Sequence, residues 1–139
     1  MSQALAVAPV LPDLRGSRVL LAEDEFVIAF GLQIDLEEMG ADVSVVDSVA
    51  DGLPQADRPF DVALLDVRLA DGDVYPLADA LQARGVPLVF HSAHADVASL
   101  TLRYPGARAL RKPCAASMIA EAVSLSVLSA LSVERAFTA

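Results

Sequence analysis

The stretch that decides the fold is Asp61-Val62-Ala63-Leu64-Leu65-Asp66, in which four apolar residues stand between two carboxylates. A short apolar run of this kind is typical of a strand buried inside a parallel sheet. Working outward from it, further strands are predicted at 18–22, 42–46, 87–91 and 108–111, and helices at 26–39, 49–55, 74–84, 96–103 and 115–135. The sequence therefore predicts five strands that alternate with five helices.

Alternating strands and helices predict βαβ units, a parallel sheet and right-handed crossovers. Five such units fit the α/β class and, within it, the flavodoxin-like doubly wound (βα)5 fold, whose five-stranded parallel sheet has the order 2-1-3-4-5. A chain of 139 residues has the size of one such domain. Ligand sites in these sheets lie at the carboxyl ends of the strands, where the strand order reverses.

The composition excludes several classes of protein. The formal net charge of −9 argues against general nucleic-acid binding, which needs basic surface against phosphates. A single cysteine, Cys114, excludes an internal disulfide and suits a reducing compartment, so we expect a cytoplasmic protein. No signal peptide and no apolar stretch of membrane-spanning length is evident, so we expect no membrane partner.

Polar residues follow four of the five predicted strands. Glu23 and Asp24 come after the first strand, Asp66 after the third, Ser92 after the fourth and Lys112 after the fifth. Each motif taken singly is commonly a solvated loop, a helix cap or a surface turn. Because the carboxyl ends of parallel strands meet at one edge of the sheet, we expect these five side chains to lie close together.

The residue types at this edge indicate phosphoryl chemistry. Clustered carboxylates offer the oxygen ligands that Mg²⁺ prefers, and the cation would offset their mutual repulsion. Asp66 would then stay ionised and could attack phosphorus as a nucleophile. The Lys112 ammonium and the Ser92 hydroxyl would contact the oxygens of the transferred group.

On these motifs the chain resembles the receiver domain of bacterial two-component response regulators, in its single-domain, CheY-like form. The resemblance covers residues 17–135. The motifs that carry it are Val19-Leu20-Leu21-Ala22-Glu23-Asp24, Leu64-Leu65-Asp66 with Asp71-Gly72 after it, Ser92-Ala93 and Lys112-Pro113.

The resemblance implies a role for each matching residue. Asp66 would be the phosphoacceptor of a phosphorelay, Ser92 the switch hydroxyl and Lys112 the residue that binds the phosphoryl group. The donor would be a sensor histidine kinase or a phosphotransfer protein. The magnesium ligands would be Asp24, Asp66, Glu23 and the backbone carbonyl of Arg68.

The resemblance also sets expectations for the whole chain. Residues 1–16 would form an N-terminal tail and residues 17–139 the receiver domain, with no output domain after it. The protein would be no enzyme beyond its own Mg²⁺-dependent phosphorylation and dephosphorylation. A phosphatase of the haloacid dehalogenase type is disfavoured, because its second aspartate, two residues after the nucleophile, is replaced by Arg68.

Two residues depart from the family pattern, the first in a way that affects the expected signalling and the second only in a loop. Ala109 stands where an aromatic residue is usual, three residues before Lys112, and Ala70 stands where a proline is common. The first departure leaves open a second hypothesis, a binding module of receiver fold that no longer responds to phosphorylation. How the switch would be read out without the aromatic ring is left open by the sequence.

Three further features carry open alternatives. The side chains of Arg68 and His94, two residues after Asp66 and Ser92, either cover the phosphoryl group or point to solvent. We expect His91 to pack around the end of its strand.

The last helix is apolar on several sides, which predicts a homodimer or partner interface on the face of the fourth and fifth helices, near Arg103, Arg108 and Arg111. The alternative is a monomer whose last helix is apolar without forming an interface.

Overall fold

The structure is a computed structural model that describes residues 13–93 and 97–138, the side chains of 132–138 excepted. All ten predicted elements are present, each within one residue of its expected bounds except the last helix, which ends three residues later than expected. In chain order the elements are β1 (Arg18–Ala22), α1 (Phe26–Glu38), β2 (Asp42–Val46), α2 (Val49–Gln55), β3 (Val62–Leu65), β4 (Arg68–Leu69), β5 (Gly72–Asp73), α3 (Tyr75–Ala83), β6 (Leu88–Ser92), α4 (Val97–Arg103), β7 (Arg108–Arg111) and α5 (Ala116–Thr138).

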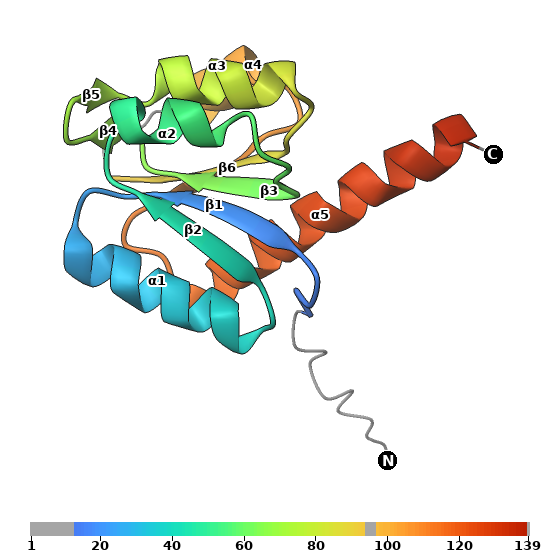
Figure 1. Cartoon of the computed structure of the whole chain (residues 1–139), viewed down its shortest axis with the longest axis horizontal. Helices are drawn as coiled ribbons and strands as arrows, with labels where there is room; N and C mark the ends of the chain where they lie inside the picture. Colours follow the sequence, from blue (N-terminus) through green and yellow to red (C-terminus); the bar gives the residue numbers. More distant parts are fainter. Residues whose placement is uncertain (1–12, 94–96, 139) are drawn as a thin grey trace.

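The main sheet has five parallel strands in the order β2-β1-β3-β6-β7. Numbered among themselves, these strands have the predicted order 2-1-3-4-5, so the doubly wound fold is confirmed (Figure 1). The central strand β3 is buried along its whole length, as its unbroken apolar run predicts.

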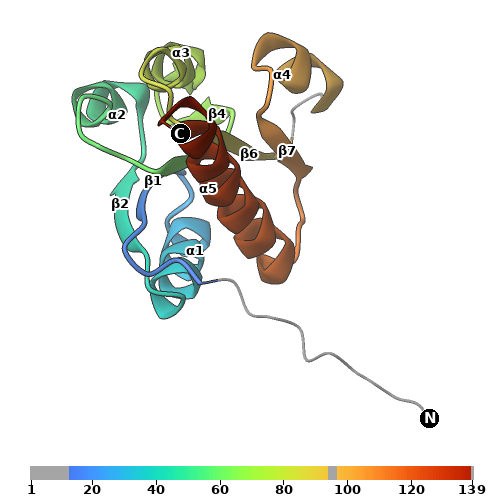
Figure 2. The same cartoon turned by 90° about the vertical axis from the view of Figure 1, so that its right-hand side faces the viewer.

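Helices cover both faces of the sheet, with α1 and α5 on one face and α2, α3 and α4 on the other (Figures 1 and 2). Two apolar clusters fill the space between the layers. One packs Leu20, Leu65 and Phe90 against α2, α3 and α4, and the other packs Leu21 and Val89 against α1 and α5. Successive residues of a strand therefore face opposite clusters, as the pleat of a strand requires.

A two-stranded hairpin that is not among the predicted elements follows the third strand of the main sheet. Arg68 pairs with Asp73 in antiparallel β4 and β5, and Gly72 turns the chain with φ +135°. The carboxylate of Asp71 accepts hydrogen bonds from the backbone N–H groups of Val49 (2.8 Å) and Ala50 (3.0 Å). The hairpin loop is thereby tied to the first turn of α2.

The packed domain begins earlier, and its last helix ends later, than the sequence predicted. Leu14 is buried and its N–H donates to the carbonyl of Met39 (2.8 Å), so the packed domain begins before the expected boundary at Ser17. At the other end α5 continues to Thr138 and extends past the edge of the sheet (Figure 1). None of the described helices is both long and apolar enough to cross a membrane.

Candidate functional site

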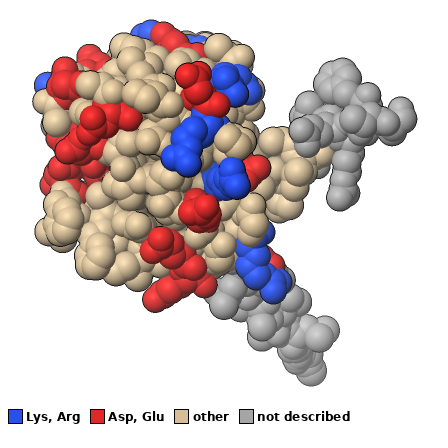
Figure 3. All heavy atoms as spheres, viewed as in Figure 1, with Lys and Arg blue, Asp and Glu red and all other residues tan. Residues whose placement is uncertain are grey.

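The predicted site residues meet at the carboxyl ends of the strands. The N–H of Glu23 donates to Val46 (3.0 Å), and the N–H of Asp66 donates to Ala22 (2.9 Å), so the ladders of β1 and β3 continue into the site. These backbone bonds fix both carboxylates at one rim. Acidic side chains line the left-hand side of Figure 3, which is the side where the strands end in Figure 1.

Lys112 bridges two of the carboxylates. Its Nζ lies 2.7 Å from Oε1 of Glu23 and 2.9 Å from Oδ2 of Asp66, and the three side chains are only 12%, 2% and 9% exposed. Burial alone would lower the pKa of Lys112, but hydrogen bonds to the two carboxylates outweigh burial and raise it. Burial raises the pKa of Glu23, against the opposing effect of Lys112. The ammonium therefore holds a buried pair of like charges together.

A third carboxylate, that of Asp24, completes an acidic cluster. One oxygen from each of Glu23, Asp24 and Asp66 lies within 4.8 Å of the others. Such a set of oxygen donors at the surface of the domain, with Asp24 exposed, fits a hard divalent cation such as Mg²⁺, which keeps several waters. The prediction that these side chains lie together is confirmed, and they are positioned to hold a metal ion.

Ser92 and Arg68 lie at the same rim in different surroundings. Ser92 ends β6, is buried, and its carbonyl accepts the N–H of Lys112 (3.1 Å). The N–H of Arg68 approaches Oδ1 of Asp66 at 3.4 Å. The guanidinium of Arg68 is exposed and lies 3.5 Å from Asp73, which favours the alternative in which this side chain points to solvent. His94 lies outside the described residues.

The comparisons with known proteins found likeness in structure only. No family model and no curated protein matches the chain. A response regulator receiver protein from Sinorhizobium medicae is 24% identical, with a TM-score of 0.76 over 85% of this chain and 99% of that one. A CheY-like response regulator receiver domain protein from Methanospirillum hungatei is 22% identical, with a TM-score of 0.75 over 84% and 97%.

A third structure carries a metal. The receiver domain of a sensor histidine kinase from Pseudomonas aeruginosa, with a magnesium ion in its active-site cleft, is 24% identical, with a TM-score of 0.70 over 81% of this chain and 98% of that one. The chain has the fold of a response-regulator receiver domain. The fold expected from the sequence is thereby confirmed.

In this receiver fold, the place of the missing aromatic residue is identifiable. Ala109 pairs with Phe90 in the neighbouring strand β6. Tyr104, at the end of α4, packs against Phe90 with ring centroids 5.3 Å apart, and its hydroxyl donates to Oδ1 of Asp79 on α3 (2.7 Å). Burial and this hydrogen bond raise the pKa of Tyr104. A buried tyrosine that directly follows α4 thus packs beside the strand pair that contains Ala109, and no sequence pattern predicted this contact.

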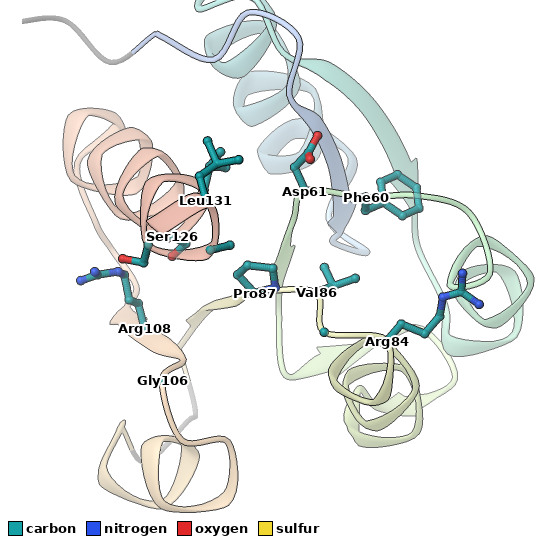
Figure 4. A pocket seen from close by; sticks show the side chains of 13 residues that line it. Phe60, Asp61, Arg84, Val86, Pro87, Gly106, Arg108, Ser126 and Leu131 are labelled. Atoms are coloured by element: carbon teal, nitrogen blue, oxygen red, sulfur yellow. The ribbon is translucent and has the colours of Figure 1, made fainter. Parts of the chain in front are cut away.

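Two hollows lie at opposite ends of the sheet in the described part of the chain. One of about 610 Å³ lies beside the acidic cluster, with Glu23, Asp24 and Phe26 in its wall, between α1 and α2. Another of about 520 Å³ lies at the amino-terminal ends of β3 and β6, between Asp61, Pro87 and the outer part of α5 (Figure 4). None of the predicted site residues lines this second hollow, so it is separate from the acidic cluster.

Proposed function

We propose that this protein is a receiver domain of a two-component phosphorelay that accepts a phosphoryl group on Asp66. The observation that carries the proposal is the setting of this carboxylate. Asp66 is buried at the end of the central strand, bonded to the only lysine of the sequence, Lys112, and gathered with Glu23 and Asp24 into a cluster that fits Mg²⁺. A nucleophile, a cation to neutralise phosphoryl oxygens and a metal-binding donor set are the parts that phosphoryl transfer requires.

In the proposed reaction an oxygen of Asp66 attacks the phosphorus of a phosphohistidine. The O–P bond forms as the P–N bond breaks, and the electron pair of that bond goes to the histidine nitrogen. The Lys112 ammonium exchanges its hydrogen bond to Asp66 for one to a phosphoryl oxygen. The Ser92 hydroxyl donates to another phosphoryl oxygen. Mg²⁺, held by Glu23, Asp24, Asp66 and the carbonyl of Arg68, supplies charge neutralisation when bound.

The proposed partners follow from this chemistry. A sensor histidine kinase or a phosphotransfer protein supplies the phosphoryl group, and the protein acts in the cytoplasm. It catalyses only its own phosphorylation and dephosphorylation. The signal leaves through a protein–protein surface.

The decisive experiment is the intact mass of the protein after incubation with Mg²⁺ and a small acyl phosphate. We expect the wild-type protein to gain one phosphoryl group and Asp66→Asn to gain none. Asp47→Asn makes the same chemical change at an exposed residue after β2 and should behave as wild type. No gain in the wild-type protein would refute the proposal and favour the unresponsive binding module that Ala109 suggests.

The face formed by α4, β7 and α5 is the proposed surface for a homodimer. It exposes large apolar side chains: Leu102 (82%), Met118 (55%) and Leu128 (56%). Exposed apolar surface of this kind commonly marks a protein interface. Light scattering over a concentration range, with and without a phosphoryl mimic, tests the dimer. A strict monomer in both states would exclude it.

A further inference from the structure

One buried histidine packs at the end of its strand, as expected, but its polar atoms are unpaired. His91 is 6% exposed, and within the described part of the chain neither ring nitrogen has a hydrogen-bond partner. A neutral imidazole carries one donor and one acceptor. An unsatisfied buried polar group destabilises a protein, so its presence calls for an explanation in another state of the molecule.

The register of the sheet places His91 beside the phosphoacceptor. Leu65 of β3 pairs with Phe90 of β6, so the next step along both chains brings Asp66 opposite His91. Side chains alternate along a strand, and Val89, two residues before His91, packs in the core beneath α1 and α5. The residue two before Asp66 packs in the same cluster. Asp66 and His91 are therefore cross-strand neighbours on the same face of the sheet.

The charges around His91 agree with this position. Burial lowers the pKa of His91, the Lys112 ammonium lowers it further, and the Asp66 carboxylate opposes both effects. His91 pairs with Leu110 of β7. Lys112 follows two residues later, just past the end of that strand, and is expected on the same face of the sheet as Leu110. The imidazole is thus a neutral donor that lies close to both members of the Lys112–Asp66 ion pair.

Hydrogen bonds to Asp66 change when the phosphoryl group arrives. In the structure, Oδ2 of Asp66 accepts from Lys112 (2.9 Å), and in the proposed function Lys112 moves to the phosphoryl oxygens. Oδ2 of Asp66 would then lose the donor that it has in this structure. Among the described side chains of this face, the imidazole of His91 carries a donor without a hydrogen-bond partner, and the sheet register sets it beside Asp66.

We propose that His91 is a positioning residue that acts through Asp66: it donates a hydrogen bond to the acyl oxygen of the phosphorylated side chain and so shortens the lifetime of the aspartyl phosphate. This inference rests on the proposed function. When the phosphoryl group leaves, a water oxygen or a histidine nitrogen bonds to phosphorus, the P–O bond to Asp66 breaks, and its electron pair returns to the carboxylate. A hydrogen bond to a carboxylate is about twice as strong as one to a neutral oxygen, so the donor favours this departure.

The test compares two variants of one position. His91→Leu removes the donor and fills the space with carbon, whereas His91→Gln keeps an N–H donor on a flexible chain. Each protein is phosphorylated with a small acyl phosphate and Mg²⁺, the donor is removed, and the decay of the phosphorylated mass is followed. We expect His91→Leu to lengthen the lifetime about fivefold and His91→Gln to restore most of the wild-type rate.

A second measurement separates this role from a structural one. If the imidazole is unsatisfied before phosphorylation, His91→Leu should be at least as stable to urea as the wild-type protein. A clear loss of stability would show that the imidazole already holds a structural partner such as a buried water, and would overturn the inference. Equal lifetimes in all three proteins would overturn it as well, whereas the absence of any phosphorylation would refute the proposed function itself.

Discussion

Removing the Lys112 ammonium should destabilise the protein in a way that depends on pH. The substitution Lys112→Met keeps the length and apolar stem of the side chain but removes the charge that joins Glu23 to Asp66. Both carboxylates then remain buried without a counterion. The variant should become more stable when one of them takes up a proton or when a divalent cation replaces the ammonium.

The size of the effect follows from the geometry of the cluster. Carboxylate oxygens of Glu23 and Asp66 lie within 4.8 Å of each other. At an effective dielectric constant of about 20, two unit charges at this distance repel by about 3 kcal/mol. Removal of one partner from a buried ion pair costs a similar amount, roughly 3–5 kcal/mol. We therefore expect Lys112→Met to lower the free energy of unfolding by about 3 kcal/mol near neutral pH.

The sign of the pH dependence follows from Glu23. Its pKa is already raised in the folded protein, and loss of Lys112 raises it further. When the pKa of a carboxyl is higher in the folded than in the unfolded protein, the free energy of unfolding falls as the pH rises from the unfolded pKa to the folded pKa. The gap between wild type and variant should therefore be small near pH 5 and widen toward neutral pH, by no more than about 1.4 kcal/mol per pH unit for one proton.

Urea unfolding from pH 5 to pH 8, with and without Mg²⁺, measures the gap directly. Mg²⁺ should stabilise Lys112→Met more than it stabilises the wild-type protein. The control is Arg84→Met, which removes an exposed ion pair with Asp57 (3.6 Å) and should cost less than about 1 kcal/mol with no such pH trend. A gap for Lys112→Met that stays constant with pH would refute the ion-pair argument.

Three further predictions concern the frame around the site. Asp71→Ala should lower the hydrogen-exchange protection factors of the first amides of α2, and low pH should lower them in the wild-type protein, because these hydrogen bonds lower the pKa of Asp71 and are lost as the pH falls through it. Tyr104→Phe removes the hydrogen bond to Asp79 and should cost about 1–3 kcal/mol in urea unfolding. Gly52→Val should cost roughly 1–3 kcal/mol, because a Cβ there would lie 2.6 Å from a buried leucine of α3, whereas Gly31→Ala on the open face of α1 should stabilise the protein.

The fold was predictable because its three central strands, β1, β3 and β6, are short apolar runs buried on both faces. The run from Val62 to Leu65 is short and uniformly apolar, which favours a strand in the middle of a sheet, and helical spacing of apolar residues between such runs leaves few topologies. The β4–β5 hairpin was missed because each of its strands has two residues, too few for any periodicity to appear. The hairpin loop is held to α2 by hydrogen bonds to the carboxylate of Asp71. One of these joins residues 22 positions apart in the chain, and no local pattern reveals such a contact.

The site was predictable in its membership and unpredictable in its pairing. The sheet rule brings Glu23, Asp66 and Lys112 to one rim from the sequence alone. Glu23 was expected only as a metal ligand, yet in this structure its buried carboxylate shares the Lys112 ammonium with Asp66. The contact depends on how far a side chain reaches across two strands, and this is set by register and burial. A cation at Glu23 and Asp24 would compete with Lys112 for carboxylate oxygen, so in the proposed function metal binding would favour release of the ammonium toward a phosphoryl group.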